Sequence, residues 1–481
     1  MTEYKLPNQK ESRRRRAEQE EIQYTEAAEL RSLGSGRTYY MHTYGCQANV
    51  RDGETLAGML GSMGFRETPE QAEADVLIFN TCAVRKAAEE HVLGEIGSLK
   101  PLKKAHPEKI FVLCGCMAQE EAAVKELIER YPQVDLIFGT HNLHRFPQLL
   151  QKAMQGQRVV EVESVEGAVV EGMPAVRSRK HKAFVNIMYG CDKFCTYCIV
   201  PYTRGKERSR RPGYILREIR ELRENGCREV TLLGQNVNAY GKDLGMEDAF
   251  TTLLRDCAAT GIDRIRFYSS HPRDYTVSTI EAMRDCPNIM KALHLPVQSG
   301  STEVLRRMNR GYTADHYKQL FDDMKARIPE ITFTTDLIVG FPGETDQQFQ
   351  ETLDLVDYCR FDLAYSFAFS PREGTPAASY PDSIPEEIKK ERLNILNERL
   401  ARYARENNEA YVGRTLEVLC DGPSRKNPDT LAGYSRENKL VNFTAENCRE
   451  GDLVNVRITT AKSFSLDGEA VEKTGKINIG K

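Results

Sequence analysis

The chain carries Cys191-Asp-Lys-Phe-Cys195-Thr-Tyr-Cys198 directly after a predicted strand, Phe184–Met188. Three thiols this close together form a site for a soft metal, and their number is informative. A structural zinc site or an ordinary electron-transfer cluster takes four protein ligands. A [4Fe–4S] cluster held by three cysteines keeps one iron without a protein ligand, free to bind a substrate. A zinc site that borrows a remote fourth ligand is the alternative.

Strand–helix units repeat around this cysteine loop, from Ala183 to about Gly413. The apolar runs predict strands at Phe184–Met188, Glu229–Leu233, Ile265–Tyr268, Ala292–Leu295, Phe333–Val339 and Ala364–Phe369. Six units are two short of the eight that close a complete barrel, so we predict an incomplete (βα)6 barrel. Active sites of such barrels lie at the carboxyl ends of the strands, which is where the cysteine loop begins.

Other predicted strand ends supply candidate contacts for a small cofactor. Gln235 and Asn236 follow the second strand, Gln298 follows the fourth, and Gly340 ends the fifth. Small or polar residues there allow a cofactor to approach the backbone closely. A plain turn is the competing interpretation for Gln235 and Asn236. His294, at the end of the fourth strand, is interpreted as a structural histidine rather than a catalytic base.

Residues 37–155 alternate short apolar runs with amphipathic segments, which predicts an open parallel α/β sheet. The predicted strands are Thr38–Thr43, Val76–Asn80, Ile110–Leu113 and Leu136–Phe138, and the predicted helices are Gly53–Met63, Arg85–Leu99 and Gln119–Glu129. Cys46, Cys82 and Cys116 each follow one of the first three strands. Since the carboxyl ends of parallel strands share one rim, these thiols are expected to converge there as a second three-cysteine site. Ordinary buried cysteine is the alternative, and the pattern does not separate Cys114 from Cys116.

The remaining segments complete a division into five parts. Residues 1–36 form a charged N-terminal extension with the run Arg13 to Arg16, interpreted as solvated, with RNA contact as the alternative. Residues 156–176 have no clear periodicity and are interpreted as a connector to the core at 177–409. Residues 410–475 contain short alternating strands at Thr415–Leu419, Leu440–Phe443 and Leu453–Thr459, which predict a small C-terminal β-barrel.

Composition limits the class of protein. A chain of 481 residues with net charge −3 is long enough for roughly two to four domains and is not basic overall. No apolar run reaches the roughly 18 residues of a membrane span, and the N-terminus is polar and charged, unlike a signal peptide. The 13 cysteines are an odd number without a secretory context, which favours reduced thiols. We therefore expect a cytoplasmic protein without membrane contact.

A basic run lies just beyond the cysteine loop. It consists of Arg204, Lys206, Arg208, Arg210 and Arg211. Such a run at the mouth of an active site is predicted to neutralise RNA phosphates. A solvated run of charges is the alternative.

Four motifs together make the chain similar to a known family, from Arg37 onward. They are Tyr44-Gly-Cys46-Gln-Ala-Asn49, Asn80-Thr-Cys82-Ala-Val-Arg85, Cys114-Gly-Cys116-Met-Ala-Gln119 and Tyr189-Gly-Cys-Asp-Lys-Phe-Cys-Thr-Tyr-Cys-Ile-Val-Pro-Tyr-Thr-Arg204-Gly-Lys. The chain resembles the radical S-adenosylmethionine methylthiotransferases, with a cluster domain, a radical core and a C-terminal TRAM domain. Ala48 stands where the family has methionine, and this position is not a ligand. The motifs look most like those of the members that modify isopentenyl-adenosine in tRNA.

This resemblance implies a reaction and its cofactors. Carbon 2 of N(6)-isopentenyladenosine, next to the tRNA anticodon, would gain a methylthio group. Cys191, Cys195 and Cys198 would hold the [4Fe–4S] cluster that cleaves S-adenosylmethionine to a 5′-deoxyadenosyl radical. Cys46, Cys82 and Cys116, with Cys114 structural, would hold an auxiliary [4Fe–4S] cluster that supplies the sulfur. The two cluster sites are expected to face a shared cavity.

The partners implied are the tRNA anticodon loop, an electron donor and a sulfur donor, and we expect a monomer. Sister enzymes that act on threonylcarbamoyladenosine in tRNA, or on an aspartate of a ribosomal protein, share the plan of six cysteines and remain alternatives. A non-enzymatic iron–sulfur protein for RNA binding or electron transfer is the alternative from another class. Ligation by three thiols argues against it, because an electron carrier needs no open iron.

Overall fold

The computed structural model describes residues 4–8, 11, 20–84, 86–164 and 168–473. The chain divides into two compact units, each described by itself. The first unit comprises Met1–Ser178, Met188–Arg210 and Arg372–Ala378, and the second comprises Arg179–Ile187, Arg211–Pro371 and Ser379–Lys481. No helix among the described residues has both the length and the apolar character that crossing a membrane requires.

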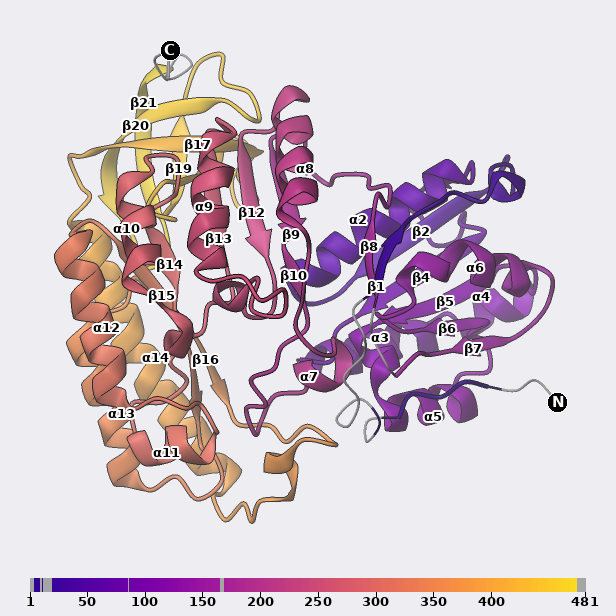
Figure 1. Ribbon diagram of the computed structural model, residues 1–481, viewed down its shortest axis with the longest axis horizontal. Coiled ribbons are helices and arrows are strands. Elements are labelled where there is room, and N and C mark those ends of the chain that lie inside the picture. The colour runs from indigo at the N-terminus through magenta and orange to yellow at the C-terminus, as the bar shows by residue number, and fades with distance from the viewer. Residues whose placement is uncertain (1–3, 9–10, 12–19, 85, 165–167, 474–481) are drawn as a thin grey trace. The chain divides into compact units, whose positions relative to one another are not determined.

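The first unit is built on a six-stranded parallel sheet with the strand order β3-β2-β4-β5-β6-β7 (Figure 1). The strands are β2 Thr38–Thr43, β3 Arg66–Glu67, β4 Val76–Thr81, β5 Ile110–Gly115, β6 Leu136–Phe138 and β7 Val159–Glu161. The predicted parallel sheet is confirmed, since every neighbouring pair is parallel. The carboxyl ends of β2, β4 and β5 therefore lie at the same edge.

Helices cover both faces of this sheet, and alternate strand residues feed two separate cores. The helices are α2 Gln47–Ser62, α3 Lys86–Ser98, α4 Lys100–Ala105, α5 Glu121–Arg130 and α6 Phe146–Met154. Ile78 and Val112 pack with α2 and α6. Their strand neighbours Phe79 and Phe111 point to the other face and pack with α3 and α5. Continuous apolar runs, such as Val76-Leu-Ile-Phe79 of β4, arise because both faces of a parallel sheet are buried.

The segments interpreted as an extension and a connector contain short strands. β7 lies in the predicted connector and adds the sixth strand of the sheet, and β8 Ala168–Glu171 pairs in parallel with β1 Glu20–Gln23. A 3-10 turn, η1 Ala28–Leu30, inserts the buried side chain of Leu30 into the core beside α2. Three or four residues are too few to produce a periodic pattern, so the sequence did not reveal these strands. The Arg13 to Arg16 run lies outside the described residues.

In the second unit six parallel strands follow one another in chain order, as predicted for an incomplete barrel. They are β9 Lys182–Asn186, β12 Glu229–Leu233, β13 Arg264–Phe267, β14 Ala292–His294, β15 Thr332–Val339 and β16 Leu363–Ala368. They form two hydrogen-bonded triplets, β13-β12-β9 and β14-β15-β16. The intervening helices are α8 Pro212–Glu224, α9 Ala249–Ala259, α10 Val277–Asp285, α11 Thr302–Arg307, α12 Ala314–Arg327, α13 Asp346–Cys359 and, after β16, α14 Glu386–Glu409.

The C-terminal part of the second unit is a closed five-stranded barrel, shown in yellow in Figure 1. Its strands are β17 Thr415–Pro423, β18 Leu431–Ser435, β19 Leu440–Thr444, β20 Leu453–Ala461 and β21 Leu466–Lys473. The predicted small barrel is thus confirmed. Arg264 of β13, fully buried, ties it to the larger barrel through the Glu417 carboxylate at 3.0 Å and the Tyr434 carbonyl at 2.8 Å.

Candidate metal centre and its surroundings

Cys46, Cys82 and Cys116 stand at three neighbouring strand ends of the first unit. Cys46 precedes α2, Cys82 follows β4, and Cys116 follows β5. Gly45 has φ +99°, and a Cβ on it would lie 2.3 Å from the Cβ of Cys82. The loops that carry Cys46 and Cys82 therefore touch, and only glycine permits this approach at that backbone conformation.

The Cys114-Gly-Cys116 turn passes equally close to the end of β4. Gly115 has φ +92°, and a Cβ there would lie 2.4 Å from the Thr81 carbonyl oxygen. Cys114, a residue of β5, is buried in the core that α2 also lines, and burial raises the pKa of its thiol well above the ordinary value. Cys116 packs instead with Ala83 and with residues of the second cysteine loop. The two cysteines therefore point to different environments, a distinction that the pattern did not provide.

Asn49, in the first turn of α2, connects the three strand ends. Its side-chain amide donates to the carbonyls of Tyr44 at 2.9 Å and Thr81 at 2.8 Å, and its Oδ1 atom lies 3.6 Å from Sγ of Cys116. The backbone carbonyl of Asn49 accepts a bond from Asn80 at 2.7 Å. Asn49 is fully buried. Sequence reasoning quoted it within a motif but gave it no role, because the predicted helix, Gly53–Met63, began four residues after it, whereas α2 begins at Gln47.

The three thiols influence one another electrostatically. A hydrogen bond from the Cys82 thiol, opposed by burial and assisted by Arg204, lowers the pKa of Cys46 to about 5. The same hydrogen bond, together with burial, raises the pKa of Cys82. Burial raises the pKa of Cys116 to about 11, and Arg204 opposes that rise.

These donors suit an iron–sulfur cluster, since thiolates are its protein ligands and a guanidinium beside them offsets its negative charge. In the described ranges no three Cys, His, Asp or Glu side chains already stand in metal-binding geometry. Ligation would therefore require the thiols to turn toward the metal.

The loop with Cys191, Cys195 and Cys198 belongs to the same compact unit. It is closed at its base by β10 Met188–Tyr189, which pairs antiparallel with β11 Arg208–Ser209. The backbone N–H of Cys191 donates to the Gly205 carbonyl at 2.9 Å. Burial is the main cause that raises the pKa of Cys191, and nearby Cys198, Glu207 and Cys195 add to it. The thiols of Cys195 and Cys198 therefore lie within electrostatic reach of Cys191.

Apolar residues of this loop pack against the first cysteine site. Ile199 and Tyr202 form one buried cluster with Ala83 and Cys116, and Phe194 packs against it. α7, Val200–Thr203, is anchored by a 2.6 Å hydrogen bond from Thr140 to the Thr203 carbonyl. Both groups of three cysteines are thus held within one body, with an apolar layer between their loops.

A remote segment, Arg372–Ala378, touches both cysteine loops. The Arg372 guanidinium lies 2.8 Å from Glu89 and donates to the Val84 carbonyl at 2.8 Å, two residues after Cys82. The backbone N–H of Ala377 donates at 2.8 Å to the carbonyl of Thr196, inside the second loop. Sequence reasoning missed this segment, because nothing local marks a loop that packs so far away in the chain.

The basic run divides into buried and accessible residues. Arg204 is 7 % exposed, and its Nη2 atom lies 2.8 Å from the Asp52 carboxylate. Arg210 forms bonds of 2.7 and 2.6 Å with buried Glu171. Arg208 is also buried and donates to the Lys206 carbonyl at 3.1 Å. Lys206 is half-buried and Arg211 is exposed. The predicted RNA contact therefore rests on Lys206 and Arg211, because the other three members of the run are buried.

The predicted cofactor contacts lie at strand ends of the second unit. Gln235 is half-buried, and Asn236 is buried and donates to Asp274 at 3.0 Å. Gln298, with φ +76°, bonds through its backbone to β15. Gly340 has φ +69°, and a Cβ there would lie 2.5 Å from Cγ of Lys389. Packing of Lys389 by itself thus explains the need for glycine at 340.

The β16 strand carries two exposed aromatic rings that sequence reasoning did not single out. Tyr365 is 49 % and Phe367 is 39 % exposed, whereas the intervening Ser366 bonds to Asn397 of α14. Tyr365 meets His294 edge-on, with ring centroids 6.3 Å apart. His294 also bonds to Thr334 at 2.9 Å and lies 3.4 Å from Asp336. These partners agree with the structural interpretation of His294.

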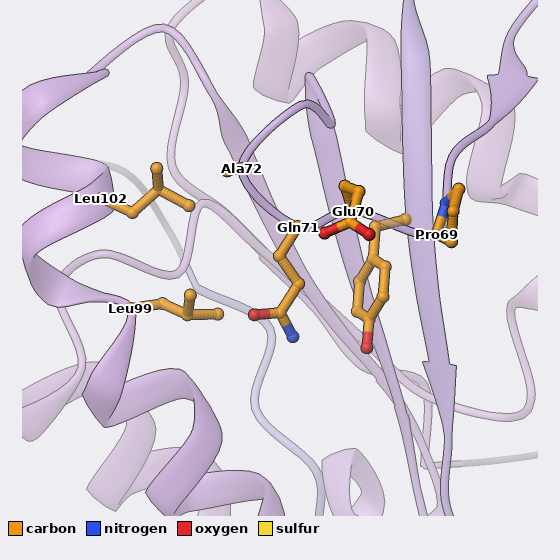
Figure 2. Close-up of a pocket in the computed structure, with 7 residues that line it drawn as sticks. Pro69, Glu70, Gln71, Ala72, Leu99 and Leu102 are labelled. Atoms are coloured by element: carbon orange, nitrogen blue, oxygen red, sulfur yellow. The ribbon is translucent and has the colours of Figure 1, made fainter.

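Two surface pockets of the first unit contain none of the six cysteines. Figure 2 shows one of about 500 Å³, where Glu70 and Gln71 lie across from Leu99 and Leu102. The other, of about 590 Å³, is lined by residues that include His42, Tyr44 and Glu95. A 2.5 Å hydrogen bond joins Gln71, which lines the first pocket, to Glu95, which lines the second. Neither pocket offers a set of soft donors.

Comparisons with known proteins show which families the chain resembles. The radical SAM superfamily profile matches residues 185–356, that of uncharacterized protein family UPF0004 matches 38–139, and that of the TRAM domain matches 409–471. The chain is 52% identical over 478 residues to the tRNA-2-methylthio-N(6)-dimethylallyladenosine synthase of Geobacillus kaustophilus, covering 98% of this chain and 90% of the relative. The synthase of the same name from Bacillus cytotoxicus is 51% identical over 474 residues, covering 98% and 93%.

A solved structure shares the fold at low identity. The radical S-adenosylmethionine methyltransferase TsrM from Kitasatospora setae, with cobalamin and a [4Fe–4S] cluster bound, aligns with a TM-score of 0.52 and 14% identity over 71% of this chain and 77% of that one. Identity over nearly the full length of the synthases is far more specific. The chain belongs to the radical S-adenosylmethionine tRNA methylthiotransferase family, transferases whose cofactors are [4Fe–4S] clusters and S-adenosylmethionine.

Proposed function

We propose that this enzyme methylthiolates carbon 2 of N(6)-isopentenyladenosine next to the tRNA anticodon, using two [4Fe–4S] clusters. Cys191, Cys195 and Cys198 hold one cluster. Cys46, Cys82 and Cys116 hold the other. The observation that carries this proposal is that one compact unit contains both three-thiol groups. An electron carrier has no need for two sites that each lack a fourth protein ligand.

The clusters, when bound, supply the electron that cleaves S-adenosylmethionine and the sulfur that is inserted. The overall change replaces C2–H by C2–S–CH3. One S-adenosylmethionine provides the methyl group, and a second is consumed to remove the hydrogen atom. An inert C–H bond without a leaving group requires such radical chemistry.

The protein residues bind, orient and exclude water. Phe194, Ile199 and Tyr202 keep the region between the two cysteine loops apolar, which protects reactive species from solvent. Asn49 and the glycines at 45 and 115 hold the strand ends together. In the second unit Gln235, Asn236, Gln298 and Gly340 are the proposed contacts of S-adenosylmethionine.

For the tRNA, Lys206 and Arg211 are the proposed phosphate contacts, and the TRAM barrel is a further RNA-binding element. A base splayed from a single-stranded loop can stack on exposed aromatic rings. Tyr365 and Phe367 offer such rings on a strand of the radical barrel. We further propose that the enzyme works as a cytoplasmic monomer, supplied by separate electron and sulfur donors.

Two measurements test the proposal. Anaerobic reconstitution of the full chain is expected to bind about eight irons, two clusters of four, and the triple Cys191→Ala, Cys195→Ala, Cys198→Ala variant about four. About four irons in the parent would overturn the two-cluster assignment. For the substrate, mass analysis of tRNA nucleosides from cells lacking the gene should show isopentenyladenosine without its 2-methylthio group. Loss of the methylthio group from threonylcarbamoyladenosine, or from a ribosomal-protein aspartate, would favour a sister activity instead.

A further inference from the structure

Arg204, six residues after Cys198, bonds directly to a thiol of the first cysteine site. Its Nε atom donates to Sγ of Cys116 at 3.2 Å. Its Nη2 atom donates to Oδ1 of Asn49 at 2.5 Å and lies 2.8 Å from Oδ2 of Asp52. The guanidinium thus uses its fork to hold a thiol, an amide and a carboxylate at once.

The position of this guanidinium is fixed from both sides. On its own loop, the Arg204 backbone N–H donates to the Val200 carbonyl at 2.8 Å, and α7 immediately before it is anchored to Thr140. On the other side, Asn49 is bonded to the carbonyls that precede Cys46 and Cys82. Arg204 therefore meets a preformed group of acceptors.

The charge at this place is permanent. An arginine does not lose its proton in a protein. Its pKa, which burial alone would lower, is raised further above the ordinary value by Asp52, Cys116 and Cys46. Asp52 is itself buried and neutralises one unit of charge. Each thiolate at the site adds negative charge beyond that pair.

Hydrogen bonds to the ligand sulfurs and net charge near a cluster set its reduction potential. A donor to a ligand sulfur and a nearby cation both stabilise the reduced, more negative form. Arg204 provides both in one group at Cys116.

We propose that Arg204 is a positioning residue that the Cys191–Cys198 loop contributes to the Cys46–Cys82–Cys116 site, where it orients Cys116 and raises the reduction potential of that cluster. This inference rests on the proposed function, because it requires a cluster on those three cysteines. It assigns Arg204 to the cluster and not to RNA phosphates. A purely structural role, as one half of a buried ion pair with Asp52, would affect folding stability but not the potential.

The test uses the full chain with both clusters, reduced stepwise and followed by electron paramagnetic resonance. The triple Cys191→Ala, Cys195→Ala, Cys198→Ala variant identifies which signal belongs to the other site. Arg204→Gln is expected to destabilise the reduced form of that cluster at least tenfold, a downward shift of about 59 mV for one electron. Arg204→Lys, which keeps the charge, should recover most of the shift. The signal of the Cys191–Cys198 cluster should move much less.

Two further variants keep the test decisive. Asp52→Asn removes a negative charge and retains an acceptor, so it should move the same potential upward. Arg210→Gln breaks a comparable buried pair, with Glu171, whose described contacts include no thiol, and should leave the potential unchanged. An unchanged potential in Arg204→Gln or in Asp52→Asn at full iron content overturns the inference. If Arg204→Gln loses the iron of this site, its reduction potential cannot be measured. The upward shift of the potential expected in Asp52→Asn then tests the inference. A parent chain with no iron on Cys46, Cys82 and Cys116 refutes the auxiliary cluster itself.

Discussion

The side-chain amide of Asn49 donates a 2.8 Å hydrogen bond to the backbone carbonyl of Thr81, the residue before Cys82. The same amide reaches the Tyr44 carbonyl, two residues before Cys46. One buried side chain in α2 thus spans the loops of two proposed ligands. A single substitution there acts on the whole site, although Asn49 is not itself a ligand.

Asn49→Ala is expected to reduce iron from about eight to about four per chain and to lower the free energy of unfolding by about 1–3 kcal/mol, since two buried carbonyls lose their donor. Iron assay and denaturant unfolding of the apoprotein measure the two effects. Asn142→Ala is the matched control, because Asn142 is also fully buried and donates to a carbonyl, that of Glu161. It should lower stability and leave the iron content intact. Equal iron loss in both variants would show that only general destabilisation is involved.

Gly45→Ala tests the close approach of the first two cysteine loops. The added Cβ would collide with Cys82 at 2.3 Å, so we expect loss of the cluster at this site. Gly36 also has positive φ, but nothing lies within 4 Å of its Cβ position. Gly36→Ala therefore has only the conformational cost of about 1–2 kcal/mol. Iron content should separate the two variants, and normal iron in Gly45→Ala would contradict the proposed convergence of Cys46 and Cys82.

Much of this site was predictable because it follows from topology. Short apolar runs between amphipathic segments predicted β2, β4 and β5, and parallel pairing then placed Cys46, Cys82 and Cys116 at one edge. The choice between Cys114 and Cys116 depends on which face each side chain occupies in a tight turn, and spacing does not determine that. The burial of Arg204 could not be predicted from the sequence either, since its partner Asp52 lies about 150 residues earlier in the chain.

Short elements and remote packing were the other omissions. β1 and β8 are four residues each and pair with one another across the chain, so neither has a local pattern of its own. Arg372 approaches Glu89 only through the tertiary fold. In β16 the sequence shows Tyr365 and Phe367 alternating with smaller residues. Large residues in such a strand usually face the core, but here they are the exposed ones.

Tyr365→Ala tests the proposed stacking surface for the target base. Removal of one stacked ring costs about 1–3 kcal/mol, so KM for a tRNA anticodon stem-loop should rise on the order of tenfold. Cleavage of S-adenosylmethionine without RNA should remain near the parent rate. Tyr365→Phe keeps the ring and should stay close to the parent. Tyr358→Ala is the matched control, because Tyr358 is equally exposed but lies on α13. A parent-like KM in Tyr365→Ala would exclude this strand from base recognition.

Glu120 makes the folding stability of the first unit depend on pH in a predictable direction. Burial, with nearby Glu89 adding to it, raises the pKa of Glu120 to about 8. A carboxyl whose pKa is higher in the folded state binds more protons when folded, so its contribution favours folding below the ordinary pKa near 4.5 and is lost as pH rises toward 8. Glu120→Gln removes this ionisation, and its unfolding free energy should exceed that of the parent at pH 8.5 by on the order of 1 kcal/mol.

At pH 5 the Glu120→Gln difference should largely vanish, because the parent carboxyl is then protonated in the folded state. Denaturant unfolding of the apoprotein at the two pH values measures this change. Glu129→Gln is the control, since Glu129 lies on α5, the helix that Glu120 directly precedes, but is exposed. It should give equal stabilities to the parent at both pH values. A Glu120→Gln difference that is the same at pH 5 and pH 8.5 would show that lost packing, and not the buried charge, determines the effect.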